Sequence, residues 1–352
     1  SLNTAVGYAA GLNVTTGTLN TLIGGLAGDA LTTATDNTFV GYLAGSATIT
    51  GNHNTGIGSN ALAANTGGQN TAVGRDALAS QVDASFNTAV GRSAGTALTT
   101  GNRNVAIGKD SLLTDTLGSR SVAVGLGSLQ TQNFTTATDV YNTSVGHAAG
   151  NQITNGIQNT ILGGLAGDAL TTSNYNVAIG YAALTTETLG ERNVAIGKSA
   201  LQTSNITTTT AVYNIAIGYH AGLSVTTGIQ NVLIGGLAGD AMTDADYNTA
   251  VGVAALGSNV LGSRNTALGS FALANQTFTT ATDSYNTAVG FDAGVTISTG
   301  TNNTIVGGLA ADAMTTGSAN TAIGMSALTT NTAGSKNVAV GFRALNTYNH
   351  NT

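Results

Sequence analysis

The sequence predicts an all-β fold, a parallel β-roll (β-solenoid) of about twenty stacked turns of 17 residues each. Three observations predict it. An Asn recurs about every 17 residues, a Gly follows it four residues later, and the residue before that Gly is always Val, Ile or Leu. A short and fixed period of this kind is the signature of a repeat array, in which each unit packs only on its neighbours.

The repeat runs through the whole chain, so we treat 1–352 as a single continuous array. The turns begin at residues 3, 20, 37, 54, 70, 87, 104, 121, 142, 159, 176, 193, 214, 231, 248, 265, 286, 303, 320 and 337. Counting each first residue as position 1, position 1 is Asn except at Ser121, position 5 is always Gly, and position 8 is Ala except at Ser111 and Ser128. Because the chain begins and ends within a turn, we expect it to be part of a longer protein.

The first five residues of each turn predict a short β-strand. In 176–180, as in the other turns, the aliphatic residue at position 4 alternates with small residues, which is typical of a strand with one buried face. Such a strand can pair with its copy in the next turn, parallel and in register. The remainder of a turn, for example 184–190, is rich in Thr, Ser, Asn and Gly and predicts turns and outer edges.

The recurring residues of each turn have predicted structural roles. Stacked Asn side chains can form a ladder of amide hydrogen bonds, and Asn tolerates left-handed backbone. The Gly is expected to have a positive φ, or to lie where another backbone leaves no room for a Cβ. The small Ala at position 8 allows close packing at the narrow end of a turn.

A second period of 72 residues groups the turns into sets of four, which begin at residues 142, 214 and 286. The turn before each set has 21 residues instead of 17, so four residues are inserted within the Thr-rich stretches 132–141, 204–213 and 276–285. Insertions in a repeat array form surface loops. The second turn of each set carries a Gly-Gly-Leu-Ala block, at 163–168, 235–240 and 307–312, and the same block occurs at 24–29.

Composition excludes several classes of function. The chain has 41% hydrophobic and 7% charged residues, 49 Gly, no Pro, no Trp and a net charge of −6. Its ten Lys and Arg are scattered, so we expect no nucleic-acid partner. The absence of Cys removes disulfides, thiol catalysis and zinc–thiolate sites. No apolar stretch approaches about 18 residues and no signal-peptide pattern is present, so no membrane insertion is expected.

No pattern of catalytic or cofactor-binding residues stands out, so we expect neither an enzyme nor a cofactor. The Gly-rich block lacks the Lys-Ser/Thr of a P-loop. His53, His147, His220 and His350 share no position in the turns, and no recurrent Ser or Asp accompanies them at a spacing typical of a catalytic triad. They are expected to be surface residues.

One weak metal hypothesis remains. Asp29, Asp168, Asp240 and Asp312 occupy the same position of their turns. In a trimer each could contribute to a ring of three carboxylates, and hard cations prefer oxygen ligands. The simpler interpretation, which we favour, is a solvated Asp in a turn.

The residue before each Asn should line one ridge along the stack. The members of this ridge that could serve recognition are Tyr141, Tyr175, Arg192, Tyr213, Tyr247, Arg264 and Tyr285, with Gln158 and Gln230 between them. Rows of Tyr and Arg can stack on sugar rings or anchor a partner. The alternative, which we favour, is that they cover a seam between chains with their stems.

Each turn offers only one or two buried aliphatic residues, so a single chain would have a thin core without disulfides. Association of chains is a natural compensation, because small cores need additional stabilisation. Three-fold symmetry is plausible, since closed cyclic assembly also protects strand edges.

The repeats, as in 70–78 and 320–328, resemble those of phage tail fibres and related structural proteins, and are also similar to the head repeats of trimeric autotransporter adhesins. Both resemblances cover essentially the whole chain and imply a left-handed parallel β-roll with three chains side by side. The adhesin heads have a shorter repeat, which favours the fibre proteins. A triangular left-handed β-helix is the structural competitor, since 6–11 fits one hexapeptide repeat.

These resemblances imply a structural shaft of a virion appendage, a homotrimer that positions or contributes to host attachment and contacts a host glycan or protein. Such a protein would be extracellular, on the virion surface. The alternative is an adhesin on a bacterial cell surface. An ice-binding solenoid is more remote, because the residue after the Asn is Val or Ile rather than Thr at positions 105, 122, 177, 194, 215, 232 and 338.

Overall fold

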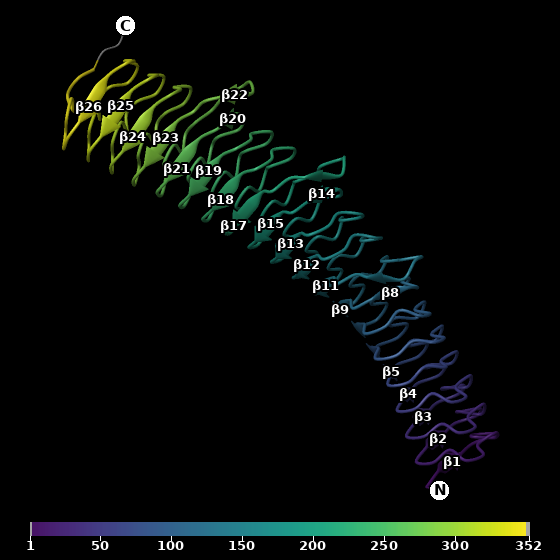
Figure 1. Ribbon diagram of the computed structural model, residues 1–352. Helices are drawn as coiled ribbons and strands as arrows, with labels where there is room; N and C mark the ends of the chain where they lie inside the picture. Colours follow the sequence, from purple (N-terminus) through teal and green to yellow (C-terminus); the bar gives the residue numbers. More distant parts are fainter. Residues whose placement is uncertain (1, 350–352) are drawn as a thin grey trace. The chain divides into compact units, whose positions relative to one another are not determined.

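The computed structural model describes residues 2–349, which contain strands, turns and bends and no helix. The chain forms two compact units, 1–175 and 176–352. Each unit is a parallel β-solenoid, and together they contain about twenty turns of about 17 residues (Figure 1). The predicted fold class is confirmed at this level. His350 lies outside the described residues.

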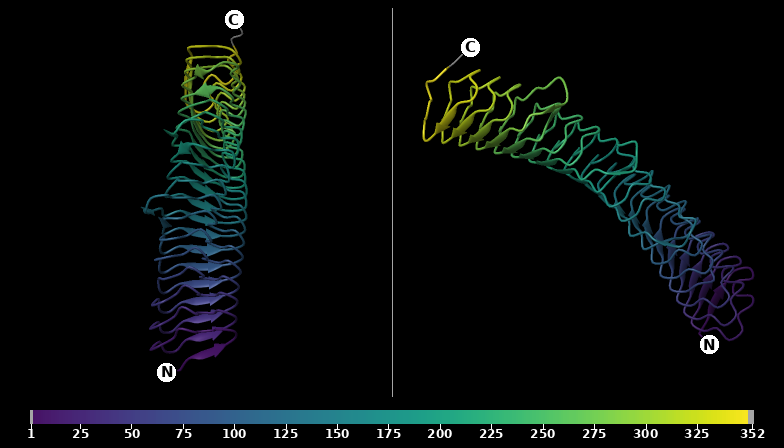
Figure 2. Two further views of the ribbon diagram at one scale, coloured as in Figure 1. Left: turned by 90° about the vertical axis from the view of Figure 1, so that its right-hand side faces the viewer. Right: turned by 45° about the horizontal axis from the view of Figure 1, so that its top comes forward.

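In the first unit, each turn contributes one three-residue strand to a parallel sheet on one side of the coil (Figure 2). These strands are β1 (Thr4–Val6), β2 (Thr21–Ile23), β3 (Thr38–Val40), β4 (Thr55–Ile57), β5 (Thr71–Val73), β6 (Thr88–Val90), β7 (Val105–Ile107), β9 (Val122–Val124), β11 (Thr143–Val145) and β12 (Thr160–Leu162). Partners lie in register, as in Thr4 opposite Thr21 and Val6 opposite Ile23. A triangular helix would instead have three sheets.

The second unit repeats this arrangement. Its three-residue strands are β13 (Val177–Ile179), β15 (Val194–Ile196), β17 (Ile215–Ile217), β18 (Val232–Ile234), β19 (Thr249–Val251), β21 (Thr266–Leu268), β23 (Thr287–Val289), β24 (Thr304–Val306), β25 (Thr321–Ile323) and β26 (Val338–Val340). They also pair parallel and in register, as in Ala195 opposite Ala216.

Three short additional pairs mark the inserted stretches. In the first unit β8 (Gly118–Ser119) pairs with β10 (Thr138–Asp139). In the second unit β14 (Gly190–Glu191) pairs with β16 (Thr210–Ala211), and β20 (Gly262–Ser263) pairs with β22 (Thr282–Asp283). Each insertion is therefore attached to the turn before it, and its extra residues form a loop on the outside of the coil.

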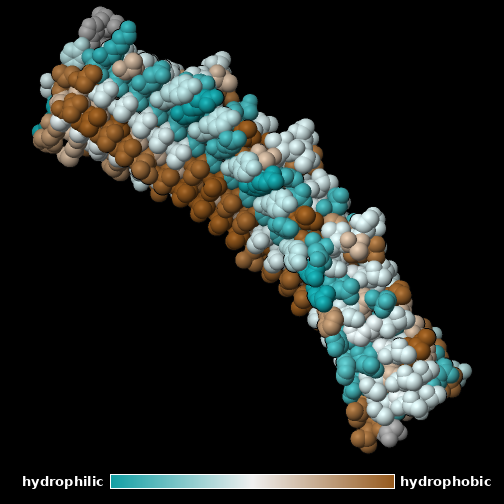
Figure 3. All heavy atoms as spheres, in the orientation of Figure 1, coloured by the Kyte–Doolittle hydropathy of each residue, from teal (hydrophilic) through white to brown (hydrophobic). Residues whose placement is uncertain are grey.

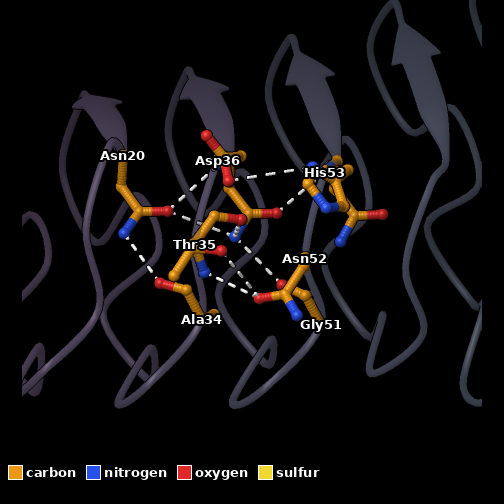
Figure 4. A network of polar contacts seen from close by, with 9 residues as sticks. Asn20, Ala34, Thr35, Asp36, Gly51, Asn52 and His53 are labelled. Atoms are coloured by element: carbon orange, nitrogen blue, oxygen red, sulfur yellow. Dashed lines mark hydrogen bonds and ion pairs between the residues drawn. The ribbon is translucent and has the colours of Figure 1, made fainter.

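The predicted Asn ladder is present, and Figure 4 shows a part of it. The side-chain oxygen of Asn20 accepts a hydrogen bond from the backbone N–H of Asn37 at 3.1 Å, and that of Asn37 accepts one from Asn54 at 2.9 Å. The Nδ2 of Asn37 also donates to the Gly51 carbonyl at 2.9 Å, and this hydrogen bond joins the first residue of the turn to a residue near its end. These amides are buried, so each hydrogen bond satisfies a group that water cannot reach.

Both predicted reasons for the Gly at position 5 hold. At Gly74, for example, φ is +137° and an added Cβ would lie 2.4 Å from the carbonyl oxygen of Gly91 in the next turn. An L-residue would be strained there and would also push the two turns apart. The Asn itself is not left-handed. The residue before it is, as at Tyr141 (φ 55°) and Arg264 (φ 62°).

The inward face of the strand differs from the one that the sequence predicted. Position 3, which is usually Ala, points inward, and from Leu22 to Ala339 it is buried in every turn. Position 4 points outward, and its aliphatic side chain remains partly exposed, as in Leu268 (46%) and Ile57 (40%). The prediction that the aliphatic residue of the strand fills the core is wrong for the single chain, because the interior of the narrow coil has room chiefly for small side chains.

Most of the larger core side chains lie at positions 9 and 12, in an exchange: where one of these positions is small, the other is usually large. In turns with Gly at position 9, such as Gly28 and Gly95, an aliphatic side chain at position 12 (Leu31, Leu98) fills the space beside it, within 3.1 Å of where a Cβ would be. In the turns with Leu at position 9 from Leu62 to Leu328, position 12 is polar yet fully buried. These polar residues are Asn65, Gln81, Asp115, Gln132, Glu187, Ser204, Asn259, Gln276 and Asn331.

The same exchange occurs in three of the four turns that carry the Gly-Gly-Leu-Ala block, which have Gly28, Gly167 and Gly239 at position 9, whereas the fourth has Ala311 there. In these three turns the inward strand residue is larger, as in Leu22 and Leu233, and it lies directly over the Gly at position 9. At Gly239 an added Cβ would lie 2.8 Å from Leu233 Cδ2 and 2.7 Å from the sulfur of Met242. These glycines at position 9 therefore make room for neighbouring side chains.

Candidate recognition ridge and inserted loops

The ridge predicted before each Asn exists in both units, because the residues at this place from Leu19 to Lys336 all have a left-handed backbone that turns the side chain outward. Tyr141, Tyr213 and Tyr285 are each about half exposed, at 51%, 51% and 52%. Tyr175 and Tyr247 are exposed to 42% and 43%. These five Tyr therefore present ring surface to solvent.

Arginine side chains lie against several of these rings. The guanidinium carbon of Arg120 is 5.6 Å from the ring centre of Tyr141, and that of Arg192 is 5.8 Å from Tyr213. Arg264 lies between Tyr247 at 4.8 Å and Tyr285 at 5.8 Å. At exposed sites such cation–π contacts contribute about 0.5–1 kcal/mol each, so they orient the side chains more than they stabilise the fold.

Each of these arginines forms an ion pair with an acidic residue. Asp139 pairs with Arg120, Glu191 with Arg192 (3.2 Å) and Asp283 with Arg264 (2.9 Å). The acid is supplied by either member of the cross-strand pair at the base of the inserted loop. The pairs are Ser119–Asp139, Glu191–Ala211 and Ser263–Asp283.

Each inserted loop thus has an Arg, a Tyr and one acid in the same arrangement. The acid of the second loop stands at a different position of the repeat from the other two, but in every loop it forms an ion pair with the Arg. Sequence reasoning found the Tyr residues, Arg192 and Arg264, but it missed Arg120 of the first loop and all three acids. The acids occupy no constant place in the repeat. Pairing across the short strands brings Asp139 and Asp283 to their Arg, whereas Glu191 directly precedes Arg192 in the sequence.

The bases of the first two loops rest on buried carboxylates that the sequence analysis also missed. Asp115 accepts hydrogen bonds from the backbone N–H groups of Gly118 and Phe134, both at 3.1 Å, and from Gln132 Nε2 at 2.6 Å. Burial raises the pKa of Asp115, although these hydrogen bonds oppose the shift. The signal in the sequence was a polar residue at position 12 wherever position 9 is Leu.

Glu187 has the same role at the second loop. Its Oε1 accepts from Gly190 N at 2.8 Å and from Ile206 N at 3.0 Å, and Ser204 Oγ donates to its other oxygen at 2.6 Å. Before the third loop the neutral Asn259 accepts from Gly262 N at 2.9 Å. A charge is therefore not required at this position, whereas a side-chain acceptor recurs.

Within each unit, the two candidate metal-ligating Asp are separated along the stack rather than gathered. In the second unit, Asp240 and Asp312 lie four turns apart, which is about 19 Å at the strand spacing. Burial raises the pKa of both carboxyls, and the Oδ1 atoms of Asp29 and Asp312 are buried without a hydrogen-bond partner. Among residues 2–349 no group of three His, Cys, Asp or Glu side chains could hold a metal ion. A ring formed across chains stays a prediction.

The described histidines lie apart from one another. His53 Nδ1 is 3.9 Å from Asp36 Oδ2 on the neighbouring turn, and both side chains are largely exposed (Figure 4). The His220 ring stacks on Tyr219 with ring centres 3.8 Å apart. His147 occupies the same outward position as Tyr219 in its own turn. None of the described residues forms a helix that could cross a membrane.

The outward side of the sheet carries the most continuous apolar surface. One aliphatic side chain per turn projects from position 4, and Figure 3 shows hydrophobic residues (brown) gathered along the strand side of the second unit. Exposed aromatic residues at position 6, including Tyr181, Tyr219 and Phe291, follow in the same turns. Monomeric soluble proteins rarely expose apolar patches of more than a few hundred Å².

No protein-family model matches this chain, and no curated protein matches it at a significant level. The fold itself defines the class of the chain, a parallel β-solenoid repeat protein. The resemblance to tail fibres and to adhesin heads stays a prediction from the repeat itself.

Proposed function

We propose that this chain is the structural shaft of a homotrimeric appendage, a virion tail fibre, that positions or contributes to attachment to a host. One observation carries the proposal: every turn directs an aliphatic residue outward from its strand, at position 4. In the single chain these residues are left partly exposed, as in Ile323 (38%) and Val90 (38%). Surface of this kind is stabilised by a partner that covers it.

The partner that fits best is another copy of the same chain. The aliphatic residues recur once per strand spacing, about 4.8 Å. A second copy has the same spacing, so its aliphatic side chains can pack between those of the first. Three copies around one axis would cover this face on each of them and close the assembly. The left-handed sense of the coil and the three-chain stoichiometry are parts of this proposal.

A mechanical role is supported by how the turns are connected. Buried Asn amides and in-register strands join each turn to the next by hydrogen bonds parallel to the stack. Such a stack resists bending and extension because every turn repeats the same bonds. The proposed location is the extracellular surface of a virion, where a rigid spacer holds a receptor-binding part at a distance.

Association can be tested by replacing outward aliphatic residues with charged ones. Leu268→Asp together with Ile323→Asp should convert a species of three times the chain mass into one of a single chain mass, measured by light scattering after size exclusion. The matched control is Thr316→Asp, an exposed residue of the same unit on the opposite part of the turn. A wild-type chain that is monomeric at all concentrations, or an assembly that tolerates both Asp residues, would contradict the proposal.

An adhesin on a bacterial cell surface would use the same architecture. Antibodies against this chain, applied to virions and to cells in immunogold microscopy, separate the two locations. The ice-binding hypothesis requires a regular Thr array, and Thr at position 2 does face outward, but it gives way to Val at residues 105 and 122 in the first unit. Thermal hysteresis in a dilute solution of the chain would favour it over the shaft.

A further inference from the structure

The first inserted loop forms a cavity of about 520 Å³ with the turn that follows it. Loop residues Asn133, Thr135, Thr136 and Thr138 line one side, and Thr154 and Asn155 line the other. Phe134 provides an apolar floor that is 7% exposed. None of the lining residues is charged. The volume lies within the range of small-molecule sites, about 300–1,000 Å³.

The cavity is held in shape by hydrogen bonds on both sides. Asn133 N donates to the Thr154 carbonyl at 2.8 Å, which joins the loop to the following turn. Thr116 Oγ1 donates to the Phe134 carbonyl at 2.7 Å, and Asp115 accepts from Phe134 N on the inner side. Thr138 Oγ1 donates to the Thr136 carbonyl at 3.0 Å within the loop. A preformed site loses little conformational entropy on binding.

The other two loops repeat this construction in the second unit. Asn205 N donates to the Thr226 carbonyl at 3.0 Å, and Thr277 N donates to the Ser298 carbonyl at 2.8 Å. Ile206 and Phe278, each 8% exposed, take the place of Phe134. The residues that correspond to the cavity lining are Thr207, Thr208, Thr210, Thr226 and Thr227 in one loop and Thr279, Thr280, Thr282, Ser298 and Thr299 in the other.

We propose that each inserted loop, together with the turn after it, is a binding site for a neutral saccharide. Hydroxyl and amide side chains both donate and accept hydrogen bonds, and this double capacity matches the hydroxyl groups of a sugar. The lining carries no cation that would select an acidic sugar, and on the other side of the loop each Arg is already neutralised by its acid. The floor residue offers an apolar contact to a ring face.

Repetition makes such weak sites effective. The second and third loops lie four turns apart, about 19 Å at the strand spacing. A polysaccharide or a glycan-covered surface can engage both at once, which raises the apparent affinity above that of a single site. This inference rests on the proposed attachment function and deepens it, since it names the ligand class and its sites.

The experiment uses the full chain on a printed array of neutral oligosaccharides of glucose, galactose, mannose and N-acetylglucosamine, with sialylated and sulfated glycans beside them. The test variant removes two hydroxyl groups from each loop while retaining shape. Its substitutions are Thr135→Val, Thr136→Val, Thr207→Val, Thr208→Val, Thr279→Val and Thr280→Val. The matched control makes the same change at six exposed threonines of turns without insertions, namely Thr15, Thr16, Thr33, Thr50, Thr100 and Thr316.

We expect the wild type and the control to bind the same neutral glycans, and the test variant to lose at least tenfold in apparent affinity. Variants changed in one loop should lose less than the complete set, because avidity from the other loops remains. Thermal unfolding of each variant checks that the solenoid is intact. Equal binding by the test variant, binding of acidic glycans alone, or no binding to any glycan would overturn the inference.

The mass measurement keeps the two proposals separate. A chain that assembles as a trimer but binds no neutral glycan retains the shaft proposal and removes this one. A chain that binds neutral glycans through its loops but stays monomeric retains the saccharide-binding proposal and removes the shaft proposal.

Discussion

The two faces of the same three-residue strand have opposite environments. In β21, Ala267 points inward and is fully buried, whereas its neighbour Leu268 points outward and is 46% exposed. The more hydrophobic residue is therefore on the outside. The narrow interior of the single chain is filled at this position by small side chains. The larger aliphatic residues form a surface that the chain alone leaves exposed.

The largest effect is expected from placing a charge on the inward face. Ala267→Asp would bury a carboxylate without a partner, and we expect it to unfold the neighbouring turns, with a loss of about 4 kcal/mol or more in unfolding free energy. Leu268→Asp, one residue away, should change the stability of the isolated chain by less than about 0.5 kcal/mol. Urea unfolding followed by circular dichroism, at chain concentrations at which light scattering shows a monomer, measures both. Similar losses in the two variants would refute the assignment of the faces.

A second test compares two adjacent glycines. Gly235 has φ +133°, and an added Cβ would lie 2.4 Å from the Gly252 carbonyl oxygen, whereas the nearest atom to a Cβ at Gly236 is 3.9 Å away. We expect Gly235→Ala to cost about 3 kcal/mol from strain and displaced backbone. Gly236→Ala should be nearly neutral. Unfolding midpoints of the two variants decide the matter, and equal midpoints would show that the turns can separate without cost.

The exchange between positions 9 and 12 predicts a rescue within the core. Leu256→Gly removes a buried side chain and should cost about 3 kcal/mol, as large-to-small core substitutions do. Adding Asn259→Leu recreates the combination seen at Gly28 and Leu31 and should recover more than about 1 kcal/mol of that loss. A double variant that is less stable than Leu256→Gly would mean that Asn259 has a further role, such as its acceptor contact to Gly262 N.

The smallest effect concerns the buried carboxyl of Asp115. Because burial raises the pKa of Asp115 in the folded chain, the folded state binds the proton more tightly than the unfolded state does. The contribution of Asp115 to stability is then most favourable below its unfolded pKa, about 4, and declines as the pH rises through the folded pKa.

Asp115→Asn should remove this decline, since Asn259 and Asn331 show that the position accepts an amide. The difference in unfolding midpoint between variant and wild type, measured from pH 4 to pH 7, should therefore move in favour of the variant as the pH increases. Other carboxyls titrate equally in both chains and cancel in that difference. A constant difference across this range would contradict the assignment.

The sequence by itself determined the period, the strand register and the roles of three residues. Asn at position 1, Gly at position 5 and Ala at position 8 recur with almost no exception, and stacking identical turns leaves one register for each of them. The ridge was also readable, because one residue per turn at a constant place must form a line. Those inferences require only that each turn repeats the position of the one before it along the stack.

Only the tertiary structure decided which strand face is inward, where the core volume lies and which acids hold the ridge arginines. A period of two in a strand marks two faces but does not say which is inside, and the width of the coil settles that in favour of Ala267 over Leu268. The pairing of Asp139 and Asp283 with their arginines depends on cross-strand neighbours from the next turn, about 19 residues away in sequence. Contacts between turns, rather than residues within a turn, determine these features.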